Sequence, residues 1–584
     1  MELAFMKKYV KRHWKLFLVA VFFVMLEALA DLLQPTIMSY ILDHGVAEGR
    51  MDYVLRMGGL MLLITAFGAI AAAIRNVVAS RVSQKFGMEL RADLFAKIQS
   101  LSSRNIDQFE RASLITRLTN DITQVQNFVN GLMRIFVKAP ILCIGSLIMA
   151  VRLNMHLSVV LLVVIPIVVL LVALNLKIGF SRFVKVQQAL DNVNRIIREY
   201  LSGVRVVKAF NRFDYETDKF QSANLDYQNQ SVHVNRLLAI FNPSILLTVN
   251  FGIAAVLWLG ASRVNDHQMQ VGHIVAFVNY MTQILFALMT IFLVFNMFVR
   301  AKASALRIGE VFNEVNRITW DNAATLPRME QAGRIEFDQV SFSYEGASGE
   351  PVLRNITFAC MPGETIGIIG STGSGKSTLV NLIPRFYDAD SGSIKVDGAD
   401  IRKLDPAKLR ERIAIVPQKT ILFSGTIEEN LRFGKDEATQ QEIELAAKMA
   451  QADAFITSFP EGYQTLLGQR GVNLSGGQKQ RLSIARALVR KPDILILDDC
   501  TSAVDTETEA NVKEALAQYA SGVTCLIIAQ RISSVMDADK IVVLDEGEVA
   551  GVGSHASLMA GNRIYREIFQ SQYGKELLVH ADHE

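Results

Sequence analysis

The residue spacing best suited to chemistry is a glycine-rich run in the second half of the chain. The run fits the pattern G-x-x-x-x-G-K-[ST] and follows an apolar stretch, residues 365–369, that we predict to be a buried strand. In such a loop, backbone N–H groups bind phosphates, the lysine meets the β/γ charge and the hydroxyl reaches Mg2+. The run, with the first residue after it, comprises Gly370, Ser371, Thr372, Gly373, Ser374, Gly375, Lys376, Ser377 and Thr378. It predicts a nucleoside-triphosphate site.

Two further motifs follow in a fixed order. The first is Leu474 followed by Ser475, Gly476, Gly477 and Gln478. The second is an apolar run, residues 494–497, that ends in Asp498. Together with the glycine-rich run, these motifs resemble the ATPase domain of ABC transporters, and the resemblance implies ATP and Mg2+ as cofactors.

The resemblance also implies roles for single residues. Asp498 would hold Mg2+ or its water shell together with Ser377, as the acid after the apolar strand does in this family. Gln418, after Val416 and Pro417, matches the family's glutamine that touches the metal and communicates with the membrane domain. Tyr344 matches the aromatic residue that stacks on adenine, although a tyrosine in a strand is ordinarily a packing residue.

The chain departs from the family pattern at the positions that would carry out hydrolysis with Lys376. Asp499 stands where a glutamate usually positions the attacking water, and Gln530 stands where a histidine is usual. An aspartate is one methylene shorter, and a misplacement on that scale can lower a rate about 100-fold. Gln469 also replaces a usual glutamate before the second motif. We expect a site that binds ATP and hydrolyses it poorly; a slower but active enzyme is the alternative.

The intact second motif has a different implication. In the family, its residues open a helix whose N-terminus faces the γ-phosphate of ATP on the opposite subunit, which agrees with anion binding by helix N-termini. The chain has one such motif, so the resemblance implies a half-transporter that needs a second ATPase domain. The chain thus combines changes at the base and switch positions with an intact second motif, which comprises Ser475, Gly476, Gly477 and Gln478. This combination resembles the degenerate-site subunit of heterodimeric bacterial multidrug exporters. A related but different subunit is the expected partner.

Composition agrees with a membrane protein of two or more domains. The 584 residues are 51% hydrophobic, and the long apolar runs lie before about residue 300. The formal net charge of +3 gives no reason to expect nucleic acid. The four cysteines, Cys143, Cys360, Cys500 and Cys525, have no metal-ligand spacing, and we expect small buried side chains rather than disulfides.

Six apolar segments are long enough to cross a bilayer, roughly 16–42, 54–80, 132–153, 157–178, 240–262 and 273–300. The first begins like a signal peptide but continues to about residue 42, so we expect an uncleaved span with its N-terminus in the cytoplasm. The second and third segments, and the fourth and fifth, are joined by long basic connections. The positive-inside rule places both connections in the cytoplasm, with helices that continue beyond the membrane.

This alternation resembles the membrane domain of ABC exporters, whose two intracellular loops carry coupling helices. Residues 107–110 and 118–121 fit the first loop, and residues 203–212 match the second. We therefore predict an α-helical membrane domain of the type I/IV exporter fold over residues 1–312. A linker over 313–333 and a cytosolic α/β P-loop ATPase domain over 334–584 would follow.

Glu27 and Asp31 lie one helical turn apart near the middle of the first segment. Acids at that depth are unfavourable unless they face a wet cavity or a partner. Glu27 could attract cationic substrates, or it could form a structural contact between helices, and the sequence supports both interpretations equally.

The expected function is ATP-driven export of hydrophobic or amphipathic compounds from the cytoplasmic membrane of a bacterium, by alternating access. That substrate class comes from the resemblance alone. The alternatives are a subunit that exports lipid and an ATP-gated channel or regulator that does not pump.

Overall fold

The computed structural model describes residues 5–266, 268–316, 318, 332–344, 350–501, 504, 506–519 and 522–573. The chain divides into two compact units. The helical unit comprises Met1–Gln99 and Glu110–Glu314, and the sheet unit comprises Ser100–Phe109 and Val315–Glu584. Residues 319–331 of the predicted linker lie outside the described residues.

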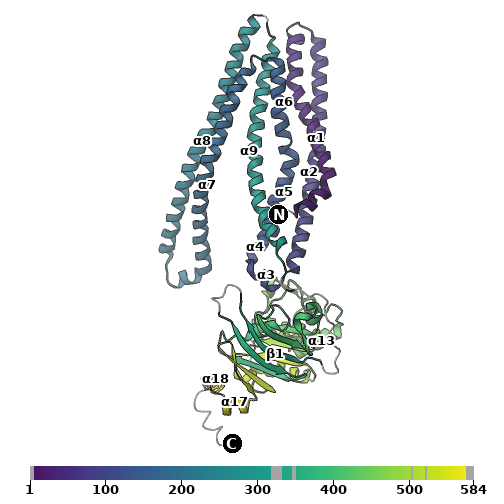
Figure 1. Cartoon of the computed structure of the whole chain (residues 1–584), viewed down its shortest axis with the longest axis vertical. Helices are drawn as coiled ribbons and strands as arrows, with labels where there is room; N and C mark the ends of the chain where they lie inside the picture. The colour runs from purple at the N-terminus through teal and green to yellow at the C-terminus, as the bar shows by residue number, and fades with distance from the viewer. Residues whose placement is uncertain are drawn as a thin grey trace. The chain divides into compact units, whose positions relative to one another are not determined.

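The helical unit contains six helical stretches that are long and apolar enough to span a membrane, within the part of the chain that the structure describes (Figure 1). The helices are α1 (Met6–Tyr40), α2 (Met51–Ser100), α4 (Arg111–Thr116), α5 (Ile122–Gly131), α6 (Lys138–Leu153), α7 (Ser158–Ala209), α8 (Phe213–Asn265) and α9 (Val271–Asn313). Short π-helical segments extend α1 over Ile41–Val46 and join α4, α5 and α6 over Arg117–Asp121 and Leu132–Phe136. The prediction of six spans is confirmed.

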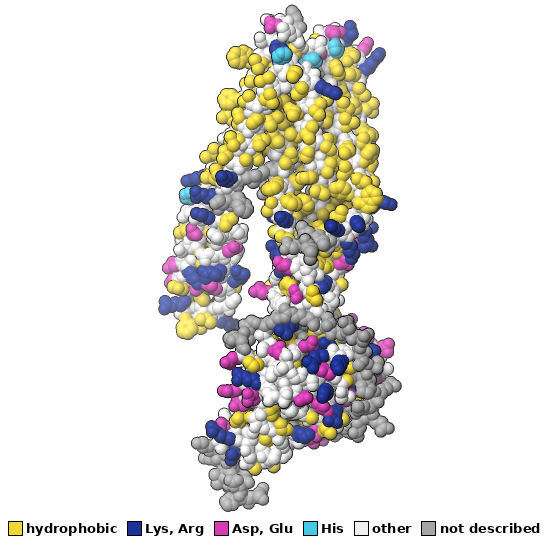
Figure 2. Space-filling model, in the orientation of Figure 1, with side chains coloured by type: hydrophobic (Ala, Val, Ile, Leu, Met, Phe, Trp, Pro, Cys, Tyr) yellow, Lys and Arg dark blue, Asp and Glu magenta, His cyan; other side chains and the backbone are white. Residues whose placement is uncertain are grey.

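Several helices are much longer than a bilayer requires. The 52 residues of α7 correspond to about 78 Å at 1.5 Å per residue, against about 30 Å for the hydrocarbon core. On this unit, Figure 2 shows hydrophobic side chains covering one stretch of the helices, with Lys and Arg gathered beyond it. The helices therefore continue outside the apolar stretch, as the basic connections predict.

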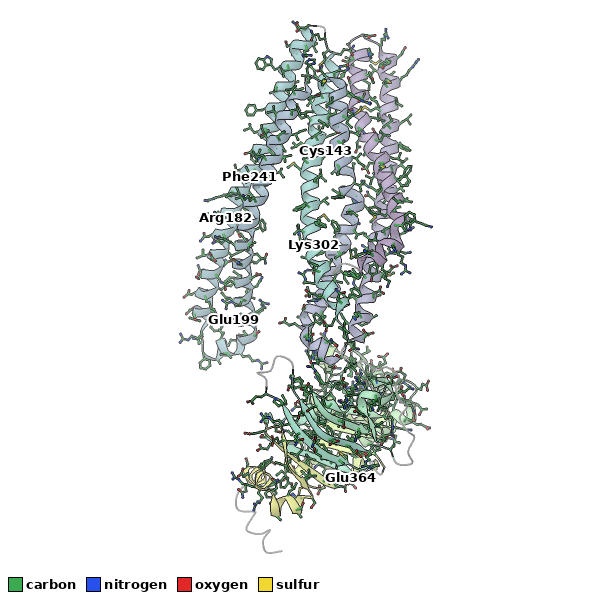
Figure 3. The ribbon with its side chains drawn as sticks, viewed as in Figure 1. Cys143, Arg182, Glu199, Phe241, Lys302 and Glu364 are labelled. Carbon is green, nitrogen blue, oxygen red and sulfur yellow. The ribbon has the colours of Figure 1, made fainter. Side chains whose placement is uncertain are left out.

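The helices pack through an apolar core and a few polar links. Phe277, Tyr280 and Met281 of α9 are buried in this core. The hydroxyl of Tyr280 donates a 2.7 Å hydrogen bond to the backbone oxygen of Leu32 in α1. α7 and α8 run side by side, and Glu199 of α7 accepts a 3.0 Å hydrogen bond from Lys219 of α8 (Figure 3).

The sheet unit contains two main sheets. A four-stranded antiparallel sheet has the order β2-β1-β4-β5. A six-stranded sheet has the order β12-β11-β3-β10-β9-β6, in which only β12 runs antiparallel to its neighbour. The strands are β1 (Ile335–Phe342), β2 (Leu353–Cys360), β3 (Thr365–Gly370), β4 (Ser391–Val396), β5 (Ala399–Asp400), β6 (Ile413–Val416), β9 (Ile494–Asp498), β10 (Thr524–Ile528), β11 (Lys540–Asp545) and β12 (Glu548–Gly553). A short pair, β7 (Gly425–Thr426) and β8 (Leu466–Leu467), lies apart from them.

The central strands of the six-stranded sheet, β3, β10 and β9, are almost wholly apolar. Every residue of β9 is buried, as is expected for a parallel strand that is covered on both faces. The helices are α10 (Lys376–Leu382), α11 (Pro406–Glu411), α12 (Ile427–Arg432), α13 (Gln440–Met449), α14 (Asp453–Thr457), α15 (Gly476–Val489), α16 (Thr506–Tyr519), α17 (His555–Gly561) and α18 (Arg563–Tyr573). A six-helix region followed by an α/β domain is the predicted fold class, which is confirmed.

One short helix of the first predicted domain groups with the sheet unit. This helix, α3 (Ser103–Gln108), lies within Ser100–Phe109. Its Asp107 accepts a 2.5 Å hydrogen bond from the hydroxyl of Tyr387, and Arg104 lies 3.9 Å from the carboxylate of Asp390. Asn105 donates a 3.1 Å hydrogen bond to the backbone oxygen of Val315. These contacts explain why ten residues in the first predicted domain belong structurally to the second unit.

Candidate nucleotide site

The glycine-rich run forms the turn between β3 and α10, as the sequence predicts. Gly373 and Gly375 have φ angles of 90° and 95°, in the left-handed region that favours glycine. A Cβ atom at Gly375 would lie 2.7 Å from the Cδ2 of Leu353, so a larger residue would also clash there. The turn places the start of α10 at the carboxyl end of β3, where helix N–H groups can bind an anion.

Lys376 is the first residue of α10, and its side chain folds back over the loop. Its Nζ donates hydrogen bonds of 2.9 Å and 2.7 Å to the backbone oxygens of Gly370 and Ser371. Burial lowers the pKa of Lys376, against the opposing effect of Asp498 and Asp499. A half-buried ammonium beside the loop is suited to meet the charge of a phosphate.

Ser377, at the end of the glycine-rich run, lies next to Asp498, at the end of the apolar strand, although the two motifs are far apart in the sequence. The hydroxyl of Ser377 donates a 3.1 Å hydrogen bond to Oδ1 of Asp498, the last residue of β9. Burial raises the pKa of Asp498, and a cation at this position would offset that effect. Among the described residues, no cluster of three or more Asp, Glu, His or Cys side chains could hold a metal. One hydroxyl and one carboxylate fit Mg2+, which usually keeps several waters and takes phosphate oxygens as ligands.

Asp499 is held by two amide side chains. Its Oδ2 accepts a hydrogen bond of 2.8 Å from Nε2 of Gln530 and one of 3.1 Å from Nε2 of Gln418. The three residues follow β9, β10 and β6, which are neighbours in the sheet. The parallel strands therefore deliver all three side chains to one edge. Asp499 itself has a φ angle of 47°, which is uncommon for a residue other than glycine.

Most of the predicted site residues line one cavity of about 250 Å3. Among them are Thr372, Gly373, Gly375, Lys376, Ser377, Thr378, Gln418, Asp498, Asp499 and Gln530. Gly370, Ser371 and Ser374 belong to the same loop but do not line the cavity. Val352 and Ile528 line it as well, and the sequence analysis missed both. Ile528 ends β10 two residues before Gln530, so knowledge of the strand order would have placed it at the site. No motif in the sequence marks Val352 as a site residue.

Tyr344 lies beside this cavity rather than in its lining. Its ring makes edge-to-face contacts with Phe342 and Tyr387, at centroid distances of 4.9 Å and 5.4 Å. Its hydroxyl donates a 3.2 Å hydrogen bond to Oγ1 of Thr378. The side chain is 36% exposed. The ring is therefore packed against two aromatic side chains and remains partly exposed.

The second motif opens α15 and does not line this cavity. Ser475 caps the helix by accepting a 3.3 Å hydrogen bond from the backbone N–H of Gln478, whose side chain accepts a 2.9 Å bond in return from the N–H of Ser475. This reciprocal capping box fixes the start of the helix. Ser475 and Gly476 are exposed, and the departure Gln469 lies at the surface in the preceding turn.

The two acids of the first membrane helix are paired. The carboxylate of Glu27 lies 2.6 Å from Arg75 of α2 and 2.5 Å from Lys138 of α6, and Lys138 also lies 2.8 Å from Asp31. Of the two interpretations of Glu27, the contact between helices is the one that this geometry supports. The sequence analysis did not identify Arg75 or Lys138, because hydropathy alone gives no helix neighbours.

Comparisons with known proteins agree with this organisation. The family model for the ABC transporter transmembrane region matches residues 17–289, and a second family model, described as ABC transporter, matches residues 353–502. The six apolar helices and the candidate nucleotide site thus define an ABC exporter that has one membrane domain and one ATPase domain.

Relatives match over nearly the whole chain. The uncharacterized ABC transporter ATP-binding protein YfiB of Bacillus subtilis is 42% identical over 96% of this chain and 96% of its own. The ATP-dependent lipid A-core flippase of Dechloromonas aromatica is 33% identical over 98% and 97%. A solved bacterial Atm1-family ABC exporter with ATP bound superposes with a TM-score of 0.80, at 27% identity over 96% of this chain and 98% of that one. The chain belongs to the ABC transporter family, as an exporter half-transporter.

Proposed function

We propose that this protein is one half of a heterodimeric exporter that moves amphipathic compounds across the cytoplasmic membrane, and that its own ATP site hydrolyses slowly. The observation that carries the proposal is the contact of Asp499 with Gln418 and Gln530. The side chain of Asp499 is one methylene shorter than the glutamate usual in the family and is held by two amides, so it is poorly placed to activate water. Neither amide can accept and release a proton near neutral pH as an imidazole can.

The other residues of the site take binding roles. Bound ATP with Mg2+ supplies the free energy of transport and the charged γ-phosphate. Lys376 and the loop N–H groups neutralise and orient the phosphates, while Ser377, Asp498 and Gln418 hold the metal and its waters. Tyr344 stacks on adenine through the part of its ring that remains exposed. Binding of the nucleotide by these residues does not depend on the length of the Asp499 side chain.

The exposed start of α15 serves the partner. Gly476 and Gly477 present N–H groups at a helix N-terminus, which favours an anion, while Ser475 and Gln478 fix the start of this helix through their capping box. They lie outside the lining of this chain's own cavity. In the proposed heterodimer they complete the partner's site, which performs most of the hydrolysis.

Transport then follows from dimer closure. Two ATP molecules held between the ATPase domains bring them together, and helices that extend beyond the membrane carry this motion to the apolar spans. Hydrolysis at the partner's site resets the inward-facing state. The protein is proposed to alternate between two access states without a covalent intermediate.

Lipid export is the second candidate for the cargo. One specific observation favours it: a relative at 33% identity is named a lipid A-core flippase. Stimulation of ATP hydrolysis by lipids but not by soluble amphiphiles would select this alternative. ATP-dependent uphill accumulation in inverted vesicles would exclude a gate that does not pump.

The native mass of the protein tests the heterodimer. The complex is extracted gently from its own membranes, its mass is measured, and any chain that purifies with it is sequenced. We expect a one-to-one complex with a half-transporter that carries Glu at the position of Asp499. A homodimer alone would place Asp499 and Gln530 in both ATP sites and would overturn the heterodimer.

A further inference from the structure

A cavity of about 350 Å3 in the helical unit combines charged and apolar walls. Its size falls within the usual range for small-molecule pockets. Glu27, Arg75, Arg134 and Lys138 supply the charged side chains of its wall. Leu142 of α6 and Phe286 of α9 contribute an apolar wall. One cavity therefore offers a surface for an ionic group and another for a hydrocarbon body.

The cations of this cavity outnumber the carboxylates around it. Lys138 is shared between Glu27 and Asp31, and Arg75 pairs with Glu27. Arg134 has an exposed side chain, and no carboxylate of the described residues forms an ion pair with it. Three cations thus face two carboxylates, which leaves a net charge of +1. An uncompensated charge in an apolar region is unfavourable, and an anion would relieve it.

Arg75 provides a second, independent observation. The residue is only 7% exposed, and its Nε–H has no hydrogen-bond partner among the described residues. Its other nitrogens contact Glu27, Asn76 and the backbone oxygen of Arg134. A buried donor without a partner is costly, and an acceptor oxygen entering the cavity would satisfy it.

We propose that this cavity binds an amphipathic molecule with an anionic headgroup, such as a phosphate or a carboxylate. Arg134 and Arg75 bind the headgroup, while Leu142 and Phe286 contact the apolar body. A cationic ligand is disfavoured because Arg134 repels it and Arg75 and Lys138 already occupy Glu27. Arg75 and Arg134 also lie near the cytoplasmic ends of their predicted spans, 54–80 and 132–153.

The inference rests on the proposed function, because it assigns the cavity to the transported substrate. A binding measurement without ATP tests the binding of the ligand separately from the proposed transport function. The purified complex is placed in nanodiscs of zwitterionic lipid, and calorimetry measures its affinity for dodecyl phosphate, dodecyltrimethylammonium and inorganic phosphate. The two amphiphiles share one chain and differ in headgroup charge. We expect dodecyl phosphate to bind about tenfold more tightly than either of the others, as one charge-assisted hydrogen bond would give.

Variants locate the headgroup. Arg134→Gln is expected to weaken dodecyl phosphate binding about tenfold and to raise the affinity for dodecyltrimethylammonium, because the repelling charge is removed. Arg152→Gln, at an exposed position of α6 outside the cavity lining, is the matched control. Glu27→Gln removes a competing carboxylate and is expected to tighten dodecyl phosphate binding, which keeps the test valid if Arg134→Gln folds poorly.

Three results would overturn the inference. They are equal affinity for the two amphiphiles, unchanged affinity in Arg134→Gln, and inorganic phosphate binding as tightly as dodecyl phosphate. The last result would indicate a site for free anions rather than for amphiphiles. Failure of the proposed function would be seen separately, as an absence of ATP-dependent transport of any probe even though dodecyl phosphate binds as expected.

Discussion

Gln530 donates a 2.8 Å hydrogen bond to Oδ2 of Asp499, the same oxygen that accepts from Gln418. The side chains that replace the family's usual base and switch are therefore in direct contact. The glutamine amide fixes the short carboxylate in place instead of leaving it available to water. The two departures from the family pattern form one local arrangement at the edge of the sheet, which supports treating them as a coupled change.

The contact predicts a variant that would speed up the slow hydrolysis proposed for this site. Asp499→Glu combined with Gln530→His should raise the turnover of this site by about 10- to 100-fold, because it recovers the reach and the imidazole. ATP hydrolysis is measured in the proposed heterodimer after the partner's catalytic acid has been changed to Gln, so that only this site contributes. Asp436→Glu, at an exposed position, is the matched control. Unchanged turnover in the double variant would mean that another feature limits the site.

The bond between Tyr387 and Asp107 predicts a coupling defect. Tyr387→Phe removes the 2.5 Å hydrogen bond to α3, worth about 1 kcal/mol, while it keeps the ring against Tyr344. We expect nucleotide affinity to remain the same and substrate stimulation of ATP hydrolysis to fall. Tyr463→Phe removes a similar 2.6 Å bond to Asp453 elsewhere in the sheet unit and serves as the control. An equal loss in both variants would assign the effect to general destabilisation.

The buried pair of Glu27 and Arg75 predicts a stability effect. Arg75→Met leaves Glu27 with Lys138 alone and should lower the unfolding free energy by about 3 kcal/mol. Adding Glu27→Gln should recover part of that loss, because it removes the buried carboxylate that has lost one of its two cationic partners. Thermal unfolding in detergent checks the order of the variants, with the exposed Arg56→Met on the same helix as control. A double variant that is less stable than Arg75→Met would contradict this account.

The cysteines of the sheet unit predict a pH dependence. Burial raises the pKa of Cys360 and of Cys525 to about 12 each, and burial also raises the pKa of Cys500. An ordinary thiol ionises near pH 8.5. Because the folded values are higher, these thiols contribute stability that is complete below about pH 8.5 and is lost as the pH rises toward 12. Iodoacetamide at pH 8.5 should therefore spare all three in the folded protein and label them in urea, as peptide mass spectrometry would show. Rapid labelling of the folded protein would contradict the burial.

The sequence predicts the elements well because each depends on local information. Hydrophobic length identifies the six spans, and motif spacing identifies the loop from Gly370 to Ser377. The contact of Asp499 with Gln530 depends instead on the order of strands in the sheet, which brings β9 and β10 together. Pairing of Glu27 with Arg75 depends on how two long helices rotate against each other. The position of Tyr344 beside the cavity similarly depends on its packing against Phe342 and Tyr387.

The grouping of α3 with the sheet unit has a consequence for experiments on fragments. The chain enters the sheet unit at Ser100, leaves it after Phe109 and returns at Val315. An ATPase fragment cut at the predicted boundary would lack the surface that α3 supplies to Tyr387 and Asp390. Exchanging ATPase domains between related transporters would join one protein's α3 to another protein's tyrosine. The unit that can be exchanged is therefore discontinuous in the sequence, and chimeras that keep α3 with its own sheet unit should be the functional ones.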